Sequence, residues 1–437
     1  MAETLTPDEA AARIRPVDTL AIPLGTGQPP AFLEALGRRD DWEDLRIAGA
    51  LLLAWSEAFK HPNVHYLSGF FGPLERALRD QGANISFAPA DFRRFAPLLE
   101  QQRPRVVATV AAPPDPSGWC SLSLHAGGTY AELGRAASDP ERLLVVEVSS
   151  NFPRTNGLPP EHRHGVHIDE IDILVESEAA PFALPDPEPA ETDAAIADNA
   201  SAFIPDGATL QTGIGTIPSA IVGQLANGPG GDYGIHSEMF TNGLMALHES
   251  GKVTNRKGQF DGVSVATFAG GAPELYEWLE DNTQVAFLPV DVINSPDLIA
   301  RNRLMVTINA ALAVDIHGQV VADTIHGNQY SGIGGHEDFI SGPALSLEDR
   351  SLLCMPATAN VKGEVLSRIV PWFGPGAVIT TPRHQVDVIV TEYGAAELQG
   401  LTVHQRGRAL AEIAHPDFRD ELLEAAERAS KGRSPMP

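Results

Sequence analysis

The second half of this chain repeats the first, and that repeat limits the fold more than any other feature of the sequence. Three stretches of the first half reappear in the same order further on: 18–36 as 207–225, 115–123 as 315–323, and 171–180 as 386–396. In the longest pair, DTLAIPLGTGQPPAFLEAL and GATLQTGIGTIPSAIVGQL, each copy reads as a strand, a glycine turn and a helix opened near a proline. A single match of this kind can arise by chance, but three in order indicate a duplicated domain.

Short apolar runs rich in β-branched residues alternate with helical patterns along the whole chain. Runs such as RVVATVAAP (105–113) and VDVIVTE (386–392) have the length and composition of buried strands. Between such runs lie patterns such as IPSAIVGQLAN (217–227), which favours a helix. Strands that alternate with helices are typical of α/β folds with largely parallel sheets. We therefore predict two tandem, duplicated open α/β domains.

The joint between the two copies is expected in PFALPDPEPAETDAA (181–195), which is rich in proline and acidic residues and has no periodicity. This places the domains at 1–185 and 190–437. A chain of 437 residues fits two or three domains of ordinary size.

The overall charge limits the ligands that the chain can hold. Its net charge is −26, which argues against nucleic acid or an anionic membrane as a partner. A phosphate-bearing ligand would have to be held locally, by backbone N–H groups or a few arginines. Two cysteines, Cys120 and Cys354, do not make a disulfide framework. With a polar N-terminus and no apolar run of about 18 residues, the protein is predicted to be cytoplasmic, without a membrane span.

Two glycine turns, LGTGQPP (24–30) and TGIGTIPS (212–219), invite comparison with a dinucleotide-binding fingerprint. The position of the third glycine is held by Pro30 in one turn and Pro218 in the other, which disfavours NAD. A glycine pair before a helix still exposes backbone N–H groups to an anion or a developing oxyanion. Gly213 and Gly215 are the candidates of the second turn.

A third glycine cluster lies in YSGIGGHEDFISGPA (330–344). It is not a phosphate-binding P-loop, because no Gly-Lys-Ser/Thr follows. Glycines often only make turns. Four of them around an acidic and an aromatic residue favour instead a loop whose bare backbone approaches a ligand closely.

Two other kinds of catalytic site find less support. No Gly-x-Ser-x-Gly pentapeptide surrounds Ser237, which makes it a poor nucleophile for a serine hydrolase. The run EHRHGVHIDEID carries three histidines, of which His162 and His164 would share one face of an extended segment and His167 the other. We expect a polar loop there and no metal; activity lost on chelation and restored by zinc would show otherwise.

Glu238 is the candidate nucleophile. It stands among apolar and small residues in GIHSEMFTN (234–242), between a strand-like start and a helix-like continuation. A carboxylate can attack an activated acyl group and form an anhydride. The oxyanions on that route would be stabilised by N–H donors of a glycine loop and by an amide side chain. The alternative is a helix cap or a hydrogen-bonded structural glutamate.

Taken together, these stretches resemble the acetyl-CoA hydrolase/transferase family, a branch of the class I CoA-transferases that includes 4-hydroxybutyrate, butyrate and succinate:acetate CoA-transferases. The segments that carry the resemblance are AIPLGTGQP, VEVSSNFPRTNG, LQTGIGTIPSAI, GIHSEMFTNG, TINAALAVDIHGQVVAD, GIGGHEDFISGPA, VTEYGAAELQG and RGRALAEIAHPDFRDEL. The resemblance implies two open α/β CoA-transferase domains packed together, usually as a homodimer. It also implies coenzyme A as a substrate and no tightly bound cofactor.

Residue by residue, the resemblance assigns the chemistry to the second half. Glu238 is similar to the catalytic glutamate of the family, and Asn309 of TINAAL to the amide that holds the oxyanion. Gly335 resembles the backbone N–H donor, with its neighbour Gly334 not excluded. Glu238 must be ionised to attack, so a pKa near the ordinary value of about 4.3 would serve this chemistry, and strong desolvation would hinder it.

The remaining positions concern the substrate. The turn Gly213–Gly215 with Ile217 resembles part of the wall around the acyl group, and Gly332 belongs to the same glycine loop as His336. A glutamine is expected at 336 in many relatives. His336 would favour hydroxylated or dicarboxylic acids if it lines the acid pocket, and would have no such effect if it faces solvent.

Three functions follow as hypotheses. The first is a CoA-transferase between an acyl-CoA and a small carboxylic acid such as butyrate or 4-hydroxybutyrate. The second is an acyl-CoA hydrolase that uses the same glutamate. The third is a non-catalytic CoA-binding regulatory protein.

Overall fold

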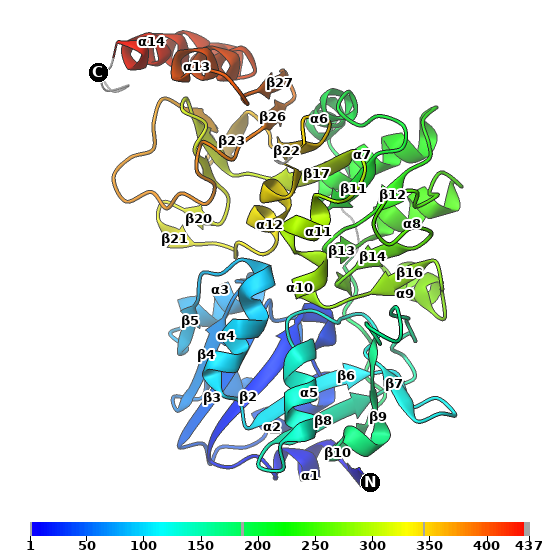
Figure 1. Ribbon diagram of the computed structural model, residues 1–437. Coiled ribbons are helices and arrows are strands. Elements are labelled where there is room, and N and C mark those ends of the chain that lie inside the picture. Colours follow the sequence, from blue (N-terminus) through cyan, green and yellow to red (C-terminus); the bar gives the residue numbers. More distant parts are fainter. Residues whose placement is uncertain (1, 185–187, 344–345, 432–437) are drawn as a thin grey trace.

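The computed structural model describes residues 2–184, 188–343 and 346–431, which form two α/β halves stacked on each other (Figure 1). The first half runs from blue to cyan at the bottom of the view. The second runs from green to red above it, and short helices of the second half lie at the junction. Within the described ranges, no helix has both the length and the apolar character needed to cross a bilayer.

The first half is built on a parallel sheet. Its strands are β1 (Glu3–Leu5), β2 (Val17–Leu24), β3 (Asp44–Ala50), β4 (Val64–Ser68), β5 (Ile85–Phe87), β6 (Val106–Ala111), β8 (Leu143–Val148) and β10 (Ile173–Glu176). They lie in the order β1-β10-β8-β6-β2-β3-β4-β5, and every neighbouring pair is parallel. All six residues of β6 are buried, as expected for a parallel strand covered on both faces.

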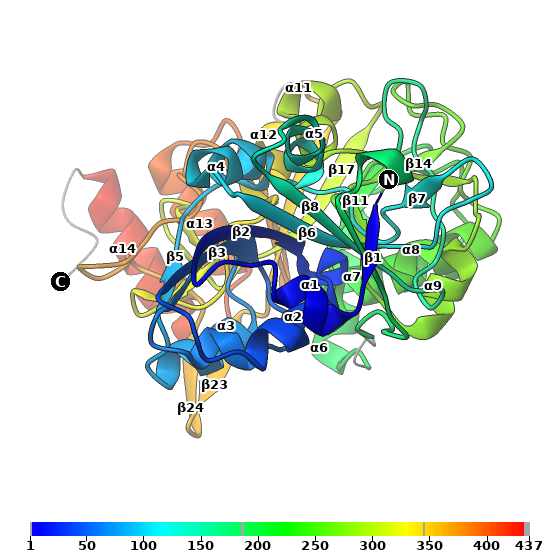
Figure 2. The same cartoon turned by 90° about the horizontal axis from the view of Figure 1, so that it is seen from below.

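Helices cover both faces of this sheet. They are α1 (Pro7–Ala11), α2 (Pro30–Gly37), α3 (Pro73–Asp80), α4 (Phe95–Gln102) and α5 (Tyr130–Ser138). In Figure 2, α1, α2 and α3 lie on one side of the strands, and α4 and α5 on the other. Alternate residues of β6 follow this division: Val106 packs in the core with α1 and α2, and Val107 in the core with α4 and α5.

The second half repeats the same strand order. Its sheet consists of β11 (Thr209–Thr212), β12 (Gly234–Ile235), β17 (Met305–Ala310), β22 (Arg350–Cys354), β26 (Val388–Thr391) and the antiparallel β27 (Gly394–Glu397). The order β12-β11-β17-β22-β26 matches β3-β2-β6-β8-β10 strand for strand. The duplication inferred from sequence is therefore confirmed in the topology.

The helices of the second half pack on both sides of its sheet and in the segments between strands. Their bounds are Glu191–Ser201 (α6), Thr216–Asn227 (α7), Asn242–Glu249 (α8), Pro273–Leu279 (α9), Val290–Ile293 (α10), Pro296–Ile299 (α11), His336–Ser341 (α12), Val403–Glu412 (α13) and Arg419–Ser430 (α14). One core contains α6 and α7, and another contains α13 and α14.

A segment inserted between β12 and β17 binds the two halves together. It contains short strand pairs: β13 (Met239–Phe240) with β15 (Phe268–Ala269), and β14 (Ser264–Ala266) with β16 (Val285–Phe287). The Thr26 hydroxyl donates to the carbonyl of Ala269 at 2.9 Å, and Ala126 N–H donates to Thr267 at 2.9 Å. The insertion is thus hydrogen-bonded to the first half.

Further short strands pair outside the two main sheets. They are β7 (Trp119–Ser121) with β9 (Gly165–His167), β18 (Ala313–Asp315) with β19 (Val320–Val321) and β25 (Ile369–Val370), β20 (Thr324–Ile325) with β21 (Asn328–Gln329), and β23 (Thr358–Val361) with β24 (Glu364–Ser367). The β23–β24 hairpin projects away from the body (Figure 2).

The expected joint, 181–195, falls between the two sheets. Of this stretch, 185–187 lies outside the described residues. The end of the stretch is not irregular as expected, because α6 begins at Glu191, where Asp193 accepts from Ala190 N–H at 2.9 Å. Division of the chain at 185 and 190 stays a prediction.

The first half also contains a buried carboxyl that ties a helix to the sheet. Glu147 of β8 accepts from the N–H groups of Ala31 and Phe32 at the start of α2, at 3.2 and 3.0 Å, and from the Ser177 hydroxyl at 2.7 Å. Because α2 has no side-chain cap of its own, this carboxyl takes that place.

We expect Glu147→Ala to lower the free energy of unfolding by about 2–4 kcal/mol, because one buried and two partly buried donors lose their acceptor. Urea unfolding followed by tryptophan fluorescence measures this. Glu34→Ala on the exposed face of α2, where 73 % of the side chain is exposed, is the control and should change stability by less than about 0.5 kcal/mol. Equal stabilities of the two variants would contradict the assigned role.

Candidate active site

Glu238 sits at the junction between β12 and β13, and hydrogen bonds of its neighbours fix the backbone there. Its carbonyl accepts from the N–H groups of Thr267 and Phe268 at 3.0 and 3.3 Å. The Ser237 hydroxyl donates to the carbonyl of Thr212 at 3.1 Å. His236 is fully buried; its Nε2 donates to the carbonyl of Ile293 at 2.8 Å. The two polar residues before Glu238 therefore position it.

Asn294, at the end of α10, links Glu238 to a second carboxyl. Its Nδ2 donates to Glu238 Oε2 at 2.7 Å and to Asp338 Oδ2 at 2.9 Å. Asp338 is fully buried and is approached from the first half by Arg93, whose Nη1 lies 3.2 Å from Oδ1 and whose backbone N–H donates to Oδ2 at 3.2 Å. A residue of the first half thus contacts one carboxyl of the pair, across the junction between the two halves.

Gly335 approaches the Glu238 carboxyl so closely that only glycine fits. Its N–H donates to that carboxyl. A methyl group on the Cα of Gly335 would lie 2.0 Å from Glu238 Oε2 and 2.6 Å from Asn294 Nδ2. The N–H donor predicted at this position is therefore directed at the glutamate itself.

The pKa of Glu238 is not near the ordinary value that would serve its ionisation. Burial raises the pKa of Glu238 to about 8, and the nearby Asp338 carboxyl adds to the increase, while the bonds from Asn294 and Gly335 oppose it. Burial likewise raises the pKa of Asp338 to about 7. The sequence places Glu238 among apolar residues but does not show how much water the tertiary fold removes. Ionising a group with this pKa at neutral pH costs about 1.4 kcal/mol.

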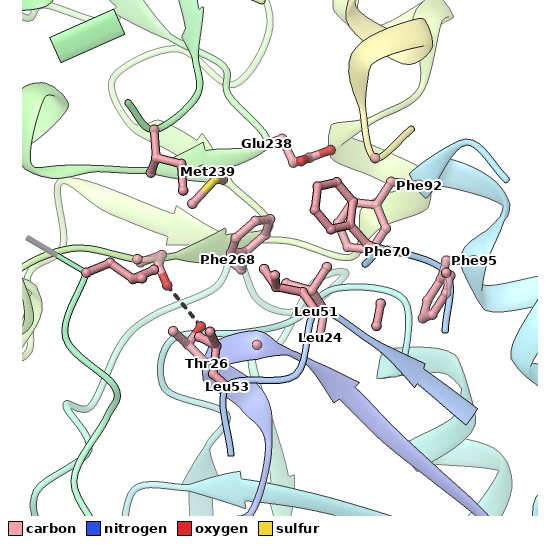
Figure 3. Close-up of a pocket in the computed structure, with 18 of the residues that line it drawn as sticks. Leu24, Thr26, Leu51, Leu53, Phe70, Phe92, Phe95, Glu238, Met239 and Phe268 are labelled. Carbon is pink, nitrogen blue, oxygen red and sulfur yellow. Dashed lines mark hydrogen bonds between the residues drawn. The ribbon is translucent and has the colours of Figure 1, made fainter. Parts of the chain in front are cut away.

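Glu238 lines two cavities, of which Figure 3 shows the first. One is apolar and enclosed, has a volume of about 150 Å³, and is lined by aromatic and leucine side chains that include Phe70, Phe92 and Phe268. The other, called the polar cavity here, has a lining of mixed polarity, is more open, has a volume of about 210 Å³, and lies on the side of the glycine loop. Glu238 and Met239 line both. A reacting group bound to Glu238 can therefore extend in two directions that differ in polarity.

Most of the residues predicted from sequence gather at the polar cavity. Those that line it are Gly213, Asn309, Gly332, Gly334, Gly335 and His336. Asn309 ends β17, and its Nδ2 donates to Gln211 Oε1 at 3.3 Å.

Two residues predicted from the second glycine turn lie elsewhere: Gly215 and Ile217 are not among the described residues that line either cavity. Gly215 has φ +123°, a conformation that glycine adopts readily, and it precedes the first residue of α7. Because α7 begins at Thr216, Ile217 already belongs to the helix, and its side chain packs against the core that contains α6 and α7. Ile214 lines the apolar cavity in its place.

The glycine loop meets the first half of the protein as well as the cavity. Phe92 N–H donates to the carbonyl of Gly334 at 2.9 Å. A methyl group on Gly332 would lie 2.7 Å from the Cα of Phe70 and 2.8 Å from the carbonyl oxygen of Gly69. A side chain at position 332 would collide with the backbone of the first half, which explains the glycine there.

His336 lines the polar cavity and does not face solvent. Only 9 % of its side chain is exposed, and its Nε2 donates to the Thr381 hydroxyl at 2.9 Å. Burial lowers the pKa of His336 to about 4, so the ring is neutral at pH 7.

Two of the three histidines of 161–172, His164 and His167, have separate hydrogen-bond partners. His164 is buried, with Nε2 donating to the carbonyl of Ser123 at 2.8 Å, and burial lowers the pKa of His164 to about 4. His167 Nε2 lies 3.0 Å from the carbonyl of Ser117. In the part of the chain that the structure describes, no three His, Cys, Asp or Glu side chains are arranged to hold a metal ion.

Sequence reasoning missed Asn294 and Arg93. Asn294 follows the apolar run VDVI and precedes Ser-Pro, where an asparagine usually marks a turn. Arg93 lies in the first half, far along the chain from Glu238.

Comparison with known proteins identifies the family. Residues 271–426 match the model of the acetyl-CoA hydrolase/transferase C-terminal domain. Over 426 residues, 96 % of each protein, the chain is 35 % identical to 4-hydroxybutyrate coenzyme A transferase of Clostridium kluyveri. The chain belongs to the acetyl-CoA hydrolase/transferase family.

Members of this family resemble the chain over nearly its whole length. It is 36 % identical over 430 residues to succinyl-CoA:cyclohexane-1-carboxylate CoA transferase of Geobacter metallireducens, covering 97 % of this chain and 95 % of that protein. The crystal structure of RipA from Yersinia pestis superimposes with a TM-score of 0.88 at 34 % identity, covering 98 % of both chains.

The raised pKa of Glu238 predicts a pH-dependent effect of Glu238→Gln on stability. Between pH 4.5 and 8 the unfolded chain has released this proton and the folded protein keeps it, so the wild type loses stability as pH rises through this window. The Glu238→Gln variant has no ionisable side chain at this position. We expect it to match the wild type near pH 5 and to be more stable by about 2–4 kcal/mol at pH 8.

Thermal unfolding of both proteins over a series of pH values measures this difference. Glu249→Gln, at the exposed end of α8, is the control and should show no such trend. A stability difference that does not change with pH would contradict the raised pKa.

Proposed function

We propose that the protein transfers coenzyme A from an acyl-CoA to a small carboxylic acid, through a glutamyl-CoA thioester on Glu238. One observation supports this above all: the Glu238 carboxyl lies where two cavities meet and is held there by donors from Asn294 and Gly335. Acetyl-CoA is the expected donor, and several relatives carry names of transferases that use acyl-CoA and carboxylic acids.

The first half-reaction begins when a carboxylate oxygen of Glu238 attacks the thioester carbonyl carbon. The C–S bond breaks, the CoA thiolate leaves, and an acyl-glutamyl anhydride remains. The thiolate then attacks the side-chain carbonyl carbon of Glu238, which releases the free acid and leaves CoA as a thioester on Glu238. An incoming carboxylate reverses these steps, so no net proton is consumed.

The raised pKa contributes to this chemistry in a defined way. A carboxylate with a pKa of about 8 is more basic than an ordinary one, and it is therefore a stronger nucleophile once ionised. The tetrahedral intermediates carry an oxyanion, and the proposal assigns its stabilisation to Asn309 and the Gly335 N–H, which both line the polar cavity.

The enclosed apolar cavity favours transfer over hydrolysis. Water that reached the glutamyl-CoA thioester would release CoA and lose the acyl activation. An acid whose hydrocarbon part fills the apolar cavity excludes water from that side. The alternatives are acyl-CoA hydrolysis and CoA binding without catalysis.

A homodimer, expected from the resemblance, forms part of the proposal.

We expect Glu238→Ala to lower CoA exchange between acetyl-CoA and labelled acetate by at least about 10³-fold, because the covalent route is lost. In the wild type incubated with acetyl-CoA alone, mass spectrometry should find CoA, less one water, on the peptide that holds Glu238. Glu249→Ala, a surface glutamate, is the control and should exchange like the wild type.

The same incubation distinguishes the alternatives. Free thiol that appears without dependence on an acceptor would indicate a hydrolase, and binding with neither product would indicate a regulatory protein. Normal exchange by Glu238→Ala, or the absence of any adduct on its peptide, would refute the proposal.

We expect Asn294→Ala to shift the pH profile of kcat/KM, because Asn294 is a positioning residue whose bond lowers the pKa of Glu238. Without this donor the pKa of Glu238 rises further. The pH at which kcat/KM increases therefore becomes higher, and kcat/KM at pH 7 falls by about 10-fold or more. Asn302→Ala is the matched control: this buried amide bonds to His236 and not to Glu238. A shift of equal size in both variants would contradict the role.

A further inference from the structure

We infer that the carboxylic acid this protein prefers carries an uncharged hydrocarbon group of about six carbons, such as a cyclohexyl, phenyl or pentyl group, and is not a dicarboxylic or hydroxylated acid. The inference rests on the proposed function and names the substrate class of the same site. The apolar cavity beside Glu238 carries the argument.

The direction of the acyl group follows from the two cavities. The pantetheine chain and phosphates of CoA are long and polar and must reach solvent, which the polar, more open cavity permits. The apolar cavity is more enclosed, so it accepts only a short group attached to the carboxyl at Glu238. The hydrocarbon part of the acid therefore enters the apolar cavity (Figure 3).

The lining of that cavity offers no partner to a second polar group. Among the described residues that line it, Glu238 and Thr26 are the only ones with a polar side chain other than the thioether of Met239, and none is Lys, Arg or His. The Thr26 hydroxyl already donates to the carbonyl of Ala269 at 2.9 Å. Arg93 is paired with Asp338 and Asp91. A second carboxylate or a hydroxyl would be buried there without a partner, which is strongly unfavourable.

The volume of the cavity sets the size of the group. It measures about 150 Å³, and leucine and phenylalanine side chains dominate its wall. A cavity of about 150 Å³ with this kind of lining stays dry and binds benzene in a well-studied engineered protein. A methyl group, as in acetate, would leave most of this space empty and forfeit its contacts.

Hydrogen bonds fix the backbone of one part of the wall, which opposes its collapse around a smaller acid. Buried Gln28 holds it: Nε2 donates to the carbonyls of Ala50 and Leu51 at 3.2 Å each, and Oε1 accepts from Leu53 N–H at 2.9 Å. Leu51 has φ +42°, an uncommon conformation for a bulky residue, and its N–H donates to Phe70 at 2.8 Å. A strained leucine fixed in this way points to a wall of defined shape.

The test is a panel of acceptors with acetyl-CoA as donor, followed by chromatography of the new acyl-CoA. Exchange with labelled acetate is measured first and establishes the proposed function independently of acceptor preference. For cyclohexanecarboxylate, hexanoate and benzoate, at least one kcat/KM should exceed those of succinate and 4-hydroxybutyrate by about 100-fold or more. If acetate exchanges but succinate or 4-hydroxybutyrate is used equally well, the inference is overturned and the transferase function stands.

Leu51→Arg tests the charge argument directly. A cation in the wall should raise the ratio of kcat/KM for succinate over hexanoate by at least about 10-fold. Leu347→Arg is the matched control, because Leu347 is 83 % exposed, and its ratio should equal that of the wild type. A folded Leu51→Arg protein with an unchanged ratio would overturn the inference. If Leu51→Arg does not fold, Leu51→Gln replaces it, and an unchanged preference for hexanoate over acetate in that variant would overturn the inference equally.

Discussion

The rest of the site depends on one amide group, the Nδ2 of Asn294, which donates to Glu238 and Asp338 together. Burial raises the pKa values of these two carboxyls to about 8 and about 7, and the bonds that they accept from Asn294 oppose the increase. Arg93 of the first half faces the outer carboxyl. The carboxyl pair at the candidate site therefore includes a contact between the two halves.

Docking of the halves also explains the sequence of the glycine loop. Gly332 allows the loop to lie against the backbone at Gly69 and Phe70, and Gly335 allows it to lie against the glutamate. One segment thus serves the interface and the site at the same time. Because an added methyl group at either position would meet atoms of the protein under 3 Å away, the loop has little freedom to vary.

The α/β class and the duplication could be predicted from the sequence, because the repeat is a local pattern, and the observed strand orders agree with it. The setting of Glu238 among apolar residues marked it as a candidate. Asn294 and Arg93 could not be found, since their significance arises from contacts between residues far apart in the chain. Ile217 was assigned to the wall by resemblance alone; it lies in the helix that the sequence predicts over 217–227, and Ile214 of the preceding turn lines the apolar cavity.

The two copies of the duplicated unit have come to face the reacting carboxyl from opposite sides. Loops that follow the strands of the first copy, at 24–26 and 50–53, make much of the apolar wall, whereas Glu238, Asn309 and Gly335 belong to the second copy. In the proposed mechanism, substitutions at 24–26 and 50–53 would alter the shape of the apolar wall without changing these three residues. Ile214, Met239 and Phe268 of the second copy complete that wall, so a change of acid preference can arise in either copy.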